Sequence, residues 1–517
     1  MTSSANAQND PRTVDGGQVV GVQGRDPGVL IFRRIPYAAP PIGELRWRAP
    51  QPVKAWTGVK TAGDFGAACV GRNFGSIPAG GMSEDCLYLN VWTPTTGVDA
   101  QLPVLVWIHG GGFQGGSGYH PSYEGEGLAK QGVVVVTFNY RVGIFGSLAH
   151  PDLTRESGVN ASGNYGFLDQ VAALQWVQRN IGSFGGNPNK VTIAGESAGA
   201  YSVSALTAST MGRGLFRAAI AESGGFLVPK RDAMRTLIDS EKIGVDFAKS
   251  VGAPNVASLR DMSADRLMKA VERMPDFFAF QPGIDGAFLT EPVYATYSKN
   301  QEAKVPILIG SNTDEGAFLL PPQRSSVKEL EARIDQTFGA NGRLVRSLYP
   351  TNTPAEMLRS ELNLYADDGF NYPMWKWAEL HGHDGSPVYY YLFGRVLPSL
   401  PDQSYKGIPR EQIGAFHGDE VPYAFGNLDL VNGALDGAPR KGRWEEADYT
   451  LSRTMLSYWA NFVKTGNPNG PELPNWPRYA DSTGNVLMHF DTRTEARPDE
   501  RTSRLKALDA GFQPTSK

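Results

Sequence analysis

The sequence predicts an α/β fold, in which helices cover both faces of a mostly parallel central sheet. The first observation is a series of runs that are continuously apolar rather than alternating with polar residues. Strands of this kind are buried on both faces, as in a parallel sheet between helix layers. The second observation is that helical patterns separate the runs, which favours right-handed strand–helix–strand units. The runs are 104–108, 133–138, 191–194, 218–221, 305–309 and 388–393.

The segment that precedes these runs is expected to form short strands and turns. Candidate strands are 18–23, 29–33 and 87–92. Prolines at positions 36, 40, 41, 50 and 52 exclude a long helix and indicate an extended segment along the surface.

Two helices are predicted by apolar stripes. In residues 167–181 the stripe is formed by Val171, Leu174, Val177 and Ile181, and Gly182 stands at the end. In residues 445–463 it is formed by Leu451, Met455, Trp459 and Phe462, with Gly466 as the stop. The second stripe can be buried inside the chain or at a dimer contact, so a monomer and a homodimer both stay open.

We expect a single domain over residues 14–517, preceded by a disordered segment, 1–13. Two polar, helical insertions interrupt the strand series, near 232–280 and 326–380. No Gly/Ser-rich or Pro-rich linker bounds either one, so we interpret both as caps over the carboxyl edge of the sheet.

The composition is that of a globular protein with a large core, since 41% of the 517 residues are apolar and 20% are charged. A net charge of −4 without like-charge blocks argues against nucleic acid or an anionic membrane as the main partner. No apolar stretch approaches the ~18–20 residues that a membrane span needs.

The motif with the clearest chemistry is Gly195-Glu196-Ser197-Ala198-Gly199, between the run 191–194 and the small-residue stretch 200–208. Gly-x-Ser-x-Gly at a strand–helix junction is typical of a nucleophilic serine on a tight turn. Side chains two positions before and after the serine would collide there, so both positions must be glycine. The amide of Ala198 then faces the same space and can donate to an oxyanion.

A serine nucleophile needs a base, and with this type of turn the histidine comes last in the chain order. Four of the seven histidines follow the serine late enough. His381 and His383 lie in a polar turn that is expected to be exposed, and His489 lies in an apolar strand. His417 follows the last long apolar run after a loop, which favours it as the base.

The acid that orients the base is expected after a strand between the serine and the histidine. Asp314 and Glu315 both follow the run 305–309, and the pattern leaves both open. Asp285 is better explained by turn chemistry. The glycines at 110–112, after the run 104–108, let backbone N–H groups approach a substrate oxygen closely.

Taken together and in order, these motifs resemble the type B carboxylesterases, the esterase and lipase family that also holds the cholinesterases. The resemblance spans roughly residues 19 to 479. The matching stretches are 35–38, 40–41, 83–90, 109–113, 139–143, 163–166, 184–188, 195–199, 313–316, 416–420 and 464–469.

The resemblance implies an α/β-hydrolase fold and hydrolysis of small-molecule carboxylic esters through an acyl-enzyme. It implies a triad of Ser197, Glu315 and His417, with Glu315 rather than Asp314 as the acid. The further residues that it implies are Gly111, Gly112 and Ala198 as oxyanion donors, Glu196 and Ser223 in support, and Cys69 and Cys86 as a disulfide. No cofactor is expected, and no metal, because no His/Cys cluster has ligand spacing.

A disulfide, together with Ala5-Asn6-Ala7 as the cleavage end of a signal, favours a secreted or periplasmic location, while reduced thiols in the cytoplasm stay open. In cholinesterases the cysteine-bounded loop is longer and carries a tryptophan that stacks on a quaternary ammonium. Here its only aromatic residue is Phe74, and Arg72 would repel a cation, so no cholinesterase activity is expected.

The remaining substrate signal is a set of aromatic residues that suggests an apolar pocket, although core packing is the more common role for each: Phe113, Phe277, Phe278, Phe280 and Phe318. The alternative function is a catalytically silent binding or adhesion module of the same family. It is disfavoured because all three triad residues are present.

Overall fold

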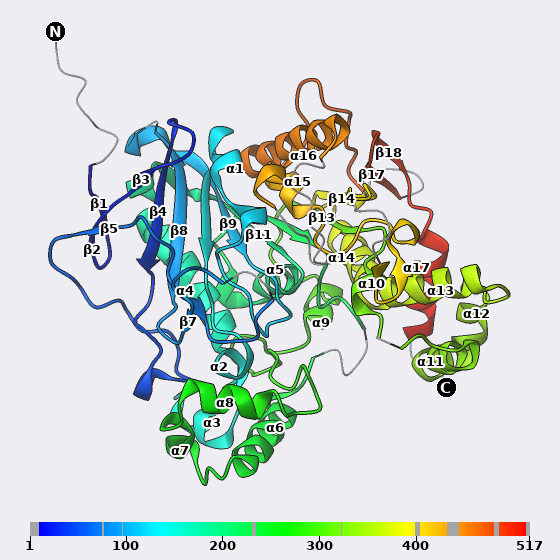
Figure 1. Ribbon diagram of the computed structural model, residues 1–517, viewed down its shortest axis with the longest axis horizontal. Helices are drawn as coiled ribbons and strands as arrows, with labels where there is room; N and C mark the ends of the chain where they lie inside the picture. The colour runs from blue at the N-terminus through cyan, green and yellow to red at the C-terminus, as the bar shows by residue number, and fades with distance from the viewer. Residues whose placement is uncertain are drawn as a thin grey trace.

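The computed structural model describes residues 10–74, 77–95, 97–229, 234–321, 323–398, 404–431, 444–479 and 485–512. Its centre is an 11-stranded sheet (Figure 1). In spatial order the strands are β18 (Thr494–Pro498), β17 (Val486–Phe490), β14 (Val388–Phe393), β13 (Ile307–Asn312), β12 (Ala218–Glu222), β11 (Gly186–Glu196), β9 (Leu102–Ile108), β10 (Val134–Phe138), β8 (Tyr88–Pro94), β4 (Val29–Pro36) and β3 (Val22–Gln23).

The sheet is parallel through its middle and antiparallel at its edges. From β10 to β17, each strand pairs in parallel with its neighbour. On one side β8, β4 and β3 are antiparallel, and on the other side so is β18. The predicted mostly parallel sheet is therefore confirmed, and each of the six apolar runs contributes a strand.

Burial on both faces accounts for the continuous apolar runs. In β9, Val106 and Ile108 face one core cluster, while Leu105 and Trp107 face the other. All four are at most 1% exposed. Because alternate side chains of a strand point to opposite faces, an apolar residue is needed at every position.

Helices form a layer on each face. The face of the sheet that carries Val106 and Ile108 is covered by α4 (Tyr165–Asn180) and α5 (Ala198–Ala208), and the predicted apolar stripe of α4 is buried there. The opposite face, which carries Leu105 and Trp107, is covered by α1 (Glu126–Lys130), α15 (Val421–Phe425) and α16 (Glu446–Thr465). Leu451, Met455 and Trp459 of α16 are buried in this core, so the stripe is covered within the chain. Gly466 ends the helix in the left-handed region, with φ 76°.

Both predicted insertions are helical (Figure 1). The first contains α6 (Leu237–Ser250), α7 (Val256–Arg260) and α8 (Ala264–Val271), which share an apolar cluster with α2 (Gly143–Ser147) and α3 (Pro151–Glu156). The second contains α11 (Val327–Phe338), α12 (Gly342–Arg346), α13 (Pro354–Ala366), a π-helical turn η8 (Asp367–Asn371) and α14 (Tyr372–Gly382). Shorter helices are α9 (Val293–Ser298) and α10 (Gly316–Leu319), and α17 (Thr502–Phe512), which was not predicted, packs on α12.

The expected disorder of segment 1–13 is wrong at its end. Residues 1–9 lie outside the described residues, but β1 (Arg12–Val14) pairs with β2 (Gly17–Val20), which in turn pairs with β5 (Val59–Thr61). A tight turn brings the chain back on itself and supplies hydrogen-bond partners for Arg12 and Thr13. Within the described residues, no helix has the length and apolar character to cross a membrane.

Candidate active site

Ser197 occupies a sharp turn between the end of β11 and the first residue of α5. Its backbone has φ 54° and ψ −123°, a conformation that is strained for a residue with a side chain. A Cβ atom on Gly195 would lie 2.7 Å from the carbonyl oxygen of Ile108, and one on Gly199 would lie 2.0 Å from that oxygen. The expected need for glycine at both positions is therefore confirmed.

His417 lies in the loop before α15 and is 2% exposed. Its Nδ1 is 2.6 Å from Oε2 of Glu315. The rings of Phe318 and Phe370 lie against the imidazole, with centroid distances of 4.8 Å and 4.5 Å. Nε2 has no hydrogen-bond partner among the described residues, and it lies 3.2 Å from Oε1 of Glu196. The unpartnered nitrogen can accept a proton.

Glu315 and Asp314 point in different directions from the segment after β13. Oε1 of Glu315 accepts hydrogen bonds from the backbone N–H of Asn312 at 2.8 Å and from the Ser223 hydroxyl at 2.5 Å. Asp314 instead accepts from the Gly414 amide and forms an ion pair with Arg359. Of the two carboxylates, that of Glu315 contacts the imidazole.

Electrostatics around the imidazole favour its protonated form. Burial alone would lower the pKa of His417, but the carboxylates of Glu196 and Glu315 outweigh burial and raise it above its ordinary 6.5. Burial raises the pKa of Glu196 to about 7, although His417 opposes this shift.

Two further buried carboxyl groups, those of Glu222 and Glu420, lie next to the Ser223 and Glu315 part of the site, and no sequence motif assigned them a role. Burial raises the pKa of Glu222 to about 8, although a 2.8 Å hydrogen bond donated by Trp459 Nε1 acts to lower it. Burial, reinforced by Glu222, also raises the pKa of Glu420 well above its usual value. Asn312 Nδ2 donates to Glu420 at 2.5 Å. Both residues adjoin positions that the family resemblance singles out, because Glu222 precedes Ser223 and Glu420 ends the 416–420 motif. That adjacency is the sequence feature that could have pointed to them.

The glycine-rich turn after β9 lies directly against the serine. A Cβ atom on Gly110 would be 3.1 Å from Cβ of Ser197. Gly111 and Gly112 have φ values of 108° and 59°, which glycine adopts without strain. In the part of the chain that the structure describes, no carbonyl or side chain accepts a hydrogen bond from the N–H groups of Gly111, Gly112 or Ala198. These donors are available to an oxygen atom of a ligand.

The other candidate residues have structural contacts of their own. His381 was expected to be exposed, but it is fully buried, because α14 continues to Gly382 and places it in the last helical turn. Its Nε2 is 2.8 Å from the Val305 carbonyl oxygen and its Nδ1 is 3.2 Å from Glu302. His383 is exposed, as predicted. Asp285 accepts three backbone N–H bonds within its own turn, as turn chemistry predicts.

A cavity of about 230 Å³ contains Ser197 and His417 in its wall. The remaining wall is largely apolar, and Phe277, Phe278 and Phe318 belong to it, as the sequence suggested. Phe113 and Phe280 do not line the cavity, because they are buried in the two core clusters beneath it.

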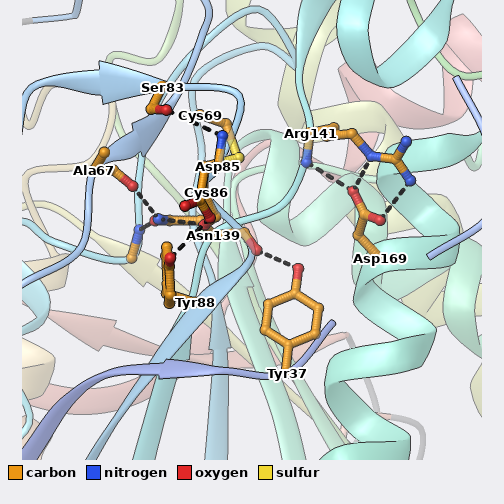
Figure 2. Close-up of a disulfide and its surroundings, with 11 residues drawn as sticks. Tyr37, Ala67, Cys69, Ser83, Asp85, Cys86, Tyr88, Asn139, Arg141 and Asp169 are labelled. Carbon is orange, nitrogen blue, oxygen red and sulfur yellow. Dashed lines mark hydrogen bonds and ion pairs between the residues drawn. A yellow bond between two sulfur atoms is a disulfide. The ribbon is translucent and has the colours of Figure 1, made fainter. Parts of the chain in front are cut away.

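Figure 2 shows that Cys69, in β6 (Ala68–Cys69), is joined by a disulfide to Cys86, which follows β7 (Met82–Ser83). The side chain of Asn139 donates to the carbonyl oxygens of Ala67 at 2.8 Å and Cys86 at 3.0 Å (Figure 2). These bonds fix both ends of the loop against the sheet, beside the cavity.

Comparisons with known proteins identify the family of the chain. The sequence model of the carboxylesterase family matches residues 9–508. Fumonisin B1 esterase of Sphingopyxis macrogoltabida is 38% identical over 91% of this chain and 85% of its own length. Para-nitrobenzyl esterase of Bacillus subtilis is 36% identical over 96% of this chain and 98% of its own length.

Solved structures give the same result. A PNB esterase structure superposes with a TM-score of 0.80 at 33% identity, covering 97% of this chain and all of that chain. A Geobacillus stearothermophilus carboxylesterase superposes with a TM-score of 0.81 at 31% identity, covering 96% and 99%. The fold is therefore that of the α/β hydrolases, and the chain belongs to the carboxylesterase family and is a carboxylic ester hydrolase.

Proposed function

We propose that the chain hydrolyses esters through a triad of Ser197, His417 and Glu315 and an acyl-enzyme intermediate. The observation that carries this proposal is the buried contact of 2.6 Å between His417 Nδ1 and Glu315 Oε2. The other ring nitrogen, His417 Nε2, has no hydrogen-bond partner among the described residues, and His417 and Ser197 line the same cavity. A base held at Nδ1 by a carboxylate and open at Nε2 is the arrangement that activates a serine hydroxyl.

In the acylation step, Ser197 Oγ attacks the ester carbonyl while His417 Nε2 accepts the hydroxyl proton. Glu315 keeps the Nδ1 proton in place and stabilises the imidazolium that forms. The negative charge that develops on the carbonyl oxygen is stabilised by the free N–H groups of the glycine-rich turn and of Ala198. His417 then protonates the leaving alcohol.

In the deacylation step, a water molecule takes the place of the alcohol and His417 acts again as base. Ser223 and Asn312 have a supporting role, because both donate to Oε1 of Glu315 and so leave Oε2 for the imidazole. Glu196 also supports the site, since its carboxyl group lies beside Nε2 and favours the imidazolium.

We further propose that residues 14–517 act as one domain whose two insertions cap the site. The first insertion supplies Phe277 and Phe278 to the cavity wall. The second supplies Phe370, whose ring lies against His417. An apolar, partly enclosed site favours neutral, hydrophobic parts of an ester next to the scissile bond.

Ser197→Ala tests the proposal. Turnover of 4-nitrophenyl butyrate and covalent labelling by a fluorophosphonate should both disappear, while the melting temperature stays unchanged. Ser457→Ala, on the exposed side of α16, is the matched control and should keep both. If Ser197→Ala retains an appreciable fraction of wild-type turnover, the nucleophile is another residue. The same labelling separates an enzyme from a silent binding module.

A further inference from the structure

Arg72 is the one lysine or arginine in the described wall of the active-site cavity. It lies in the disulfide loop, three residues after Cys69, and its guanidinium lies 4.2 Å from the ring centroid of Phe277. Among the described residues, no carboxylate forms an ion pair with it and no atom accepts a hydrogen bond from its side chain; Nε is buried and unpartnered. Within the described residues, the guanidinium therefore has no counter-ion in direct contact.

The backbone around this cation is fixed to the glycine-rich turn. The Arg72 amide donates to the carbonyl oxygen of Gln114 at 2.7 Å, and its own carbonyl oxygen would lie 2.0 Å from a Cβ atom on Gly115. The same turn also holds the aromatic segment, because Gln114 Nε2 donates to the carbonyl oxygen of Phe280 at 2.7 Å. The segments that carry Arg72 and Phe277 are thus both attached to Gln114, which follows the glycines that would bind the ester carbonyl.

The surroundings of this charge are apolar. Phe74, Phe277 and Phe278 are each 40–44% exposed although they are large hydrophobic residues, and all three line the same cavity. A guanidinium stacked on an aromatic ring keeps its N–H edge free, and that edge matches a carboxylate with two parallel hydrogen bonds. Apolar walls strengthen such a contact because they exclude screening water.

Glu196 is the acidic residue of the described lining, and its neighbours differ from those of Arg72. Glu196 is beside His417 Nε2, whereas Arg72 is beside the exposed ring of Phe277. A ligand with its scissile carbonyl at Ser197 and an anionic group beyond the phenylalanines would meet the cation without meeting this carboxyl group.

We propose that the site is selective for hydrophobic esters that carry a carboxylate, which Arg72 binds. This inference rests on the proposed function, since it assigns a substrate class to the same cavity. It also gives a role to the exposed aromatic rings, which would pack on the apolar part of the substrate between the carboxylate and the ester.

The test compares pairs of esters in which a carboxylate is replaced by its methyl ester, and wild type and variants are compared on the same pairs so that intrinsic differences in reactivity cancel. One set pairs the mono-4-nitrophenyl esters of adipic, suberic and sebacic acid with their methyl-capped forms, which places the carboxylate in the acyl part. The second pairs 4-carboxyphenyl butyrate with 4-(methoxycarbonyl)phenyl butyrate, which places it in the alcohol part. The readout is the ratio of kcat/KM for the anionic ester to that for its neutral partner.

In the pair with the largest wild-type ratio, Arg72→Gln should lower that ratio by on the order of 10-fold, as for loss of a charge-assisted hydrogen bond. The neutral ester should be turned over at nearly the wild-type rate. Arg72→Lys, which keeps the charge without the two-pronged contact, should fall between the two. Arg493→Gln, at a side chain that is 84% exposed, removes the same charge far from the cavity and should change nothing.

The inference is overturned if Arg72→Gln leaves every ratio unchanged, or if it lowers turnover of anionic and neutral esters equally. Failure of the proposed function has a different signature: the wild type would turn over no ester of either set, or Ser197→Ala would remain active.

Discussion

Replacing Glu315 by glutamine is the most specific test of the triad, because the surroundings determine how the new amide must be oriented. Two donors, the Asn312 amide and the Ser223 hydroxyl, face Oε1 of Glu315. The amide oxygen of a glutamine would take that position, so its NH₂ group would face His417 Nδ1. Nδ1 would then have to accept, and the imidazole proton would move to Nε2, where the nitrogen can no longer take the serine proton.

The expected loss in kcat is on the order of 10²–10⁴, by analogy with the aspartate-to-asparagine change in serine proteases. It corresponds to roughly 3–5 kcal/mol of activation free energy. The 2.6 Å contact between Glu315 and His417 is fully buried, which favours the upper part of that range. Steady-state hydrolysis of 4-nitrophenyl butyrate, with melting followed by circular dichroism, measures both kcat and folding.

Asp314→Asn is the matched control on the neighbouring residue. Its partners are the Gly414 amide, which an amide oxygen still satisfies, and Arg359, whose side chain is 47% exposed. The Asp314 side chain itself is only 3% exposed, so the expected cost is roughly 1–3 kcal/mol of folding free energy, that of weakening a hydrogen bond to a charged group, with kcat nearly unchanged. A larger loss of kcat in Asp314→Asn than in Glu315→Gln would refute the assignment of the acid.

Three further outcomes are expected. The kcat/KM of the wild type should fall as pH decreases through a pKa above 6.5, because only neutral His417 accepts the serine proton and its carboxylate neighbours raise that pKa. A pH profile of kcat/KM that stays flat down to pH 5 would contradict this assignment of the base. His417→Ala should abolish turnover at every pH, whereas His381→Ala should mainly lower the melting temperature. Reduction of the Cys69–Cys86 disulfide should cost about 3 kcal/mol of folding free energy, measured by urea unfolding with and without reductant, and equal midpoints would contradict it. Gly199→Ala should lose ~1–3 kcal/mol and most activity, because its methyl group would lie 2.0 Å from a carbonyl oxygen; wild-type melting and turnover would show that the turn can relax.

The strands were predictable because a parallel sheet buried on both faces leaves a distinct apolar pattern in each strand. The same topology predicts which loops meet, since the carboxyl ends of parallel strands lie at one edge of the sheet. That is why Ser197 after β11 and the two candidate acids after β13, Asp314 and Glu315, could be expected at the same edge of the sheet. The choice between Asp314 and Glu315 needed more, because it depends on the backbone direction after Asn312, which determines the side on which each carboxylate lies.

His381 shows where local pattern fails. Its neighbours, Gly382, His383 and Gly385, indicate a polar turn, yet α14 continues to Gly382 and the buried imidazole contacts the carbonyl oxygen of Val305, just before β13. Helix ends are decided by tertiary packing as well as by local residues, so burial at a helix end is poorly predicted from the polarity of the following loop.

The two further buried carboxyl groups, Glu222 and Glu420, could not be assigned to the site from the sequence for a related reason. Glu222 lies at the end of β12, Glu315 after β13, and Glu420 in the loop before α15, so only the folded sheet brings them together. In isolation each is an ordinary acidic residue at the end of an element. Their shared burial is what raises the pKa values of Glu222 and Glu420, and a group that holds its proton at neutral pH adds no negative charge to the site. The negative charge around the imidazole then comes from Glu315, the group that contacts Nδ1, from Asp419, and from the fraction of Glu196 that is ionised near its pKa of about 7.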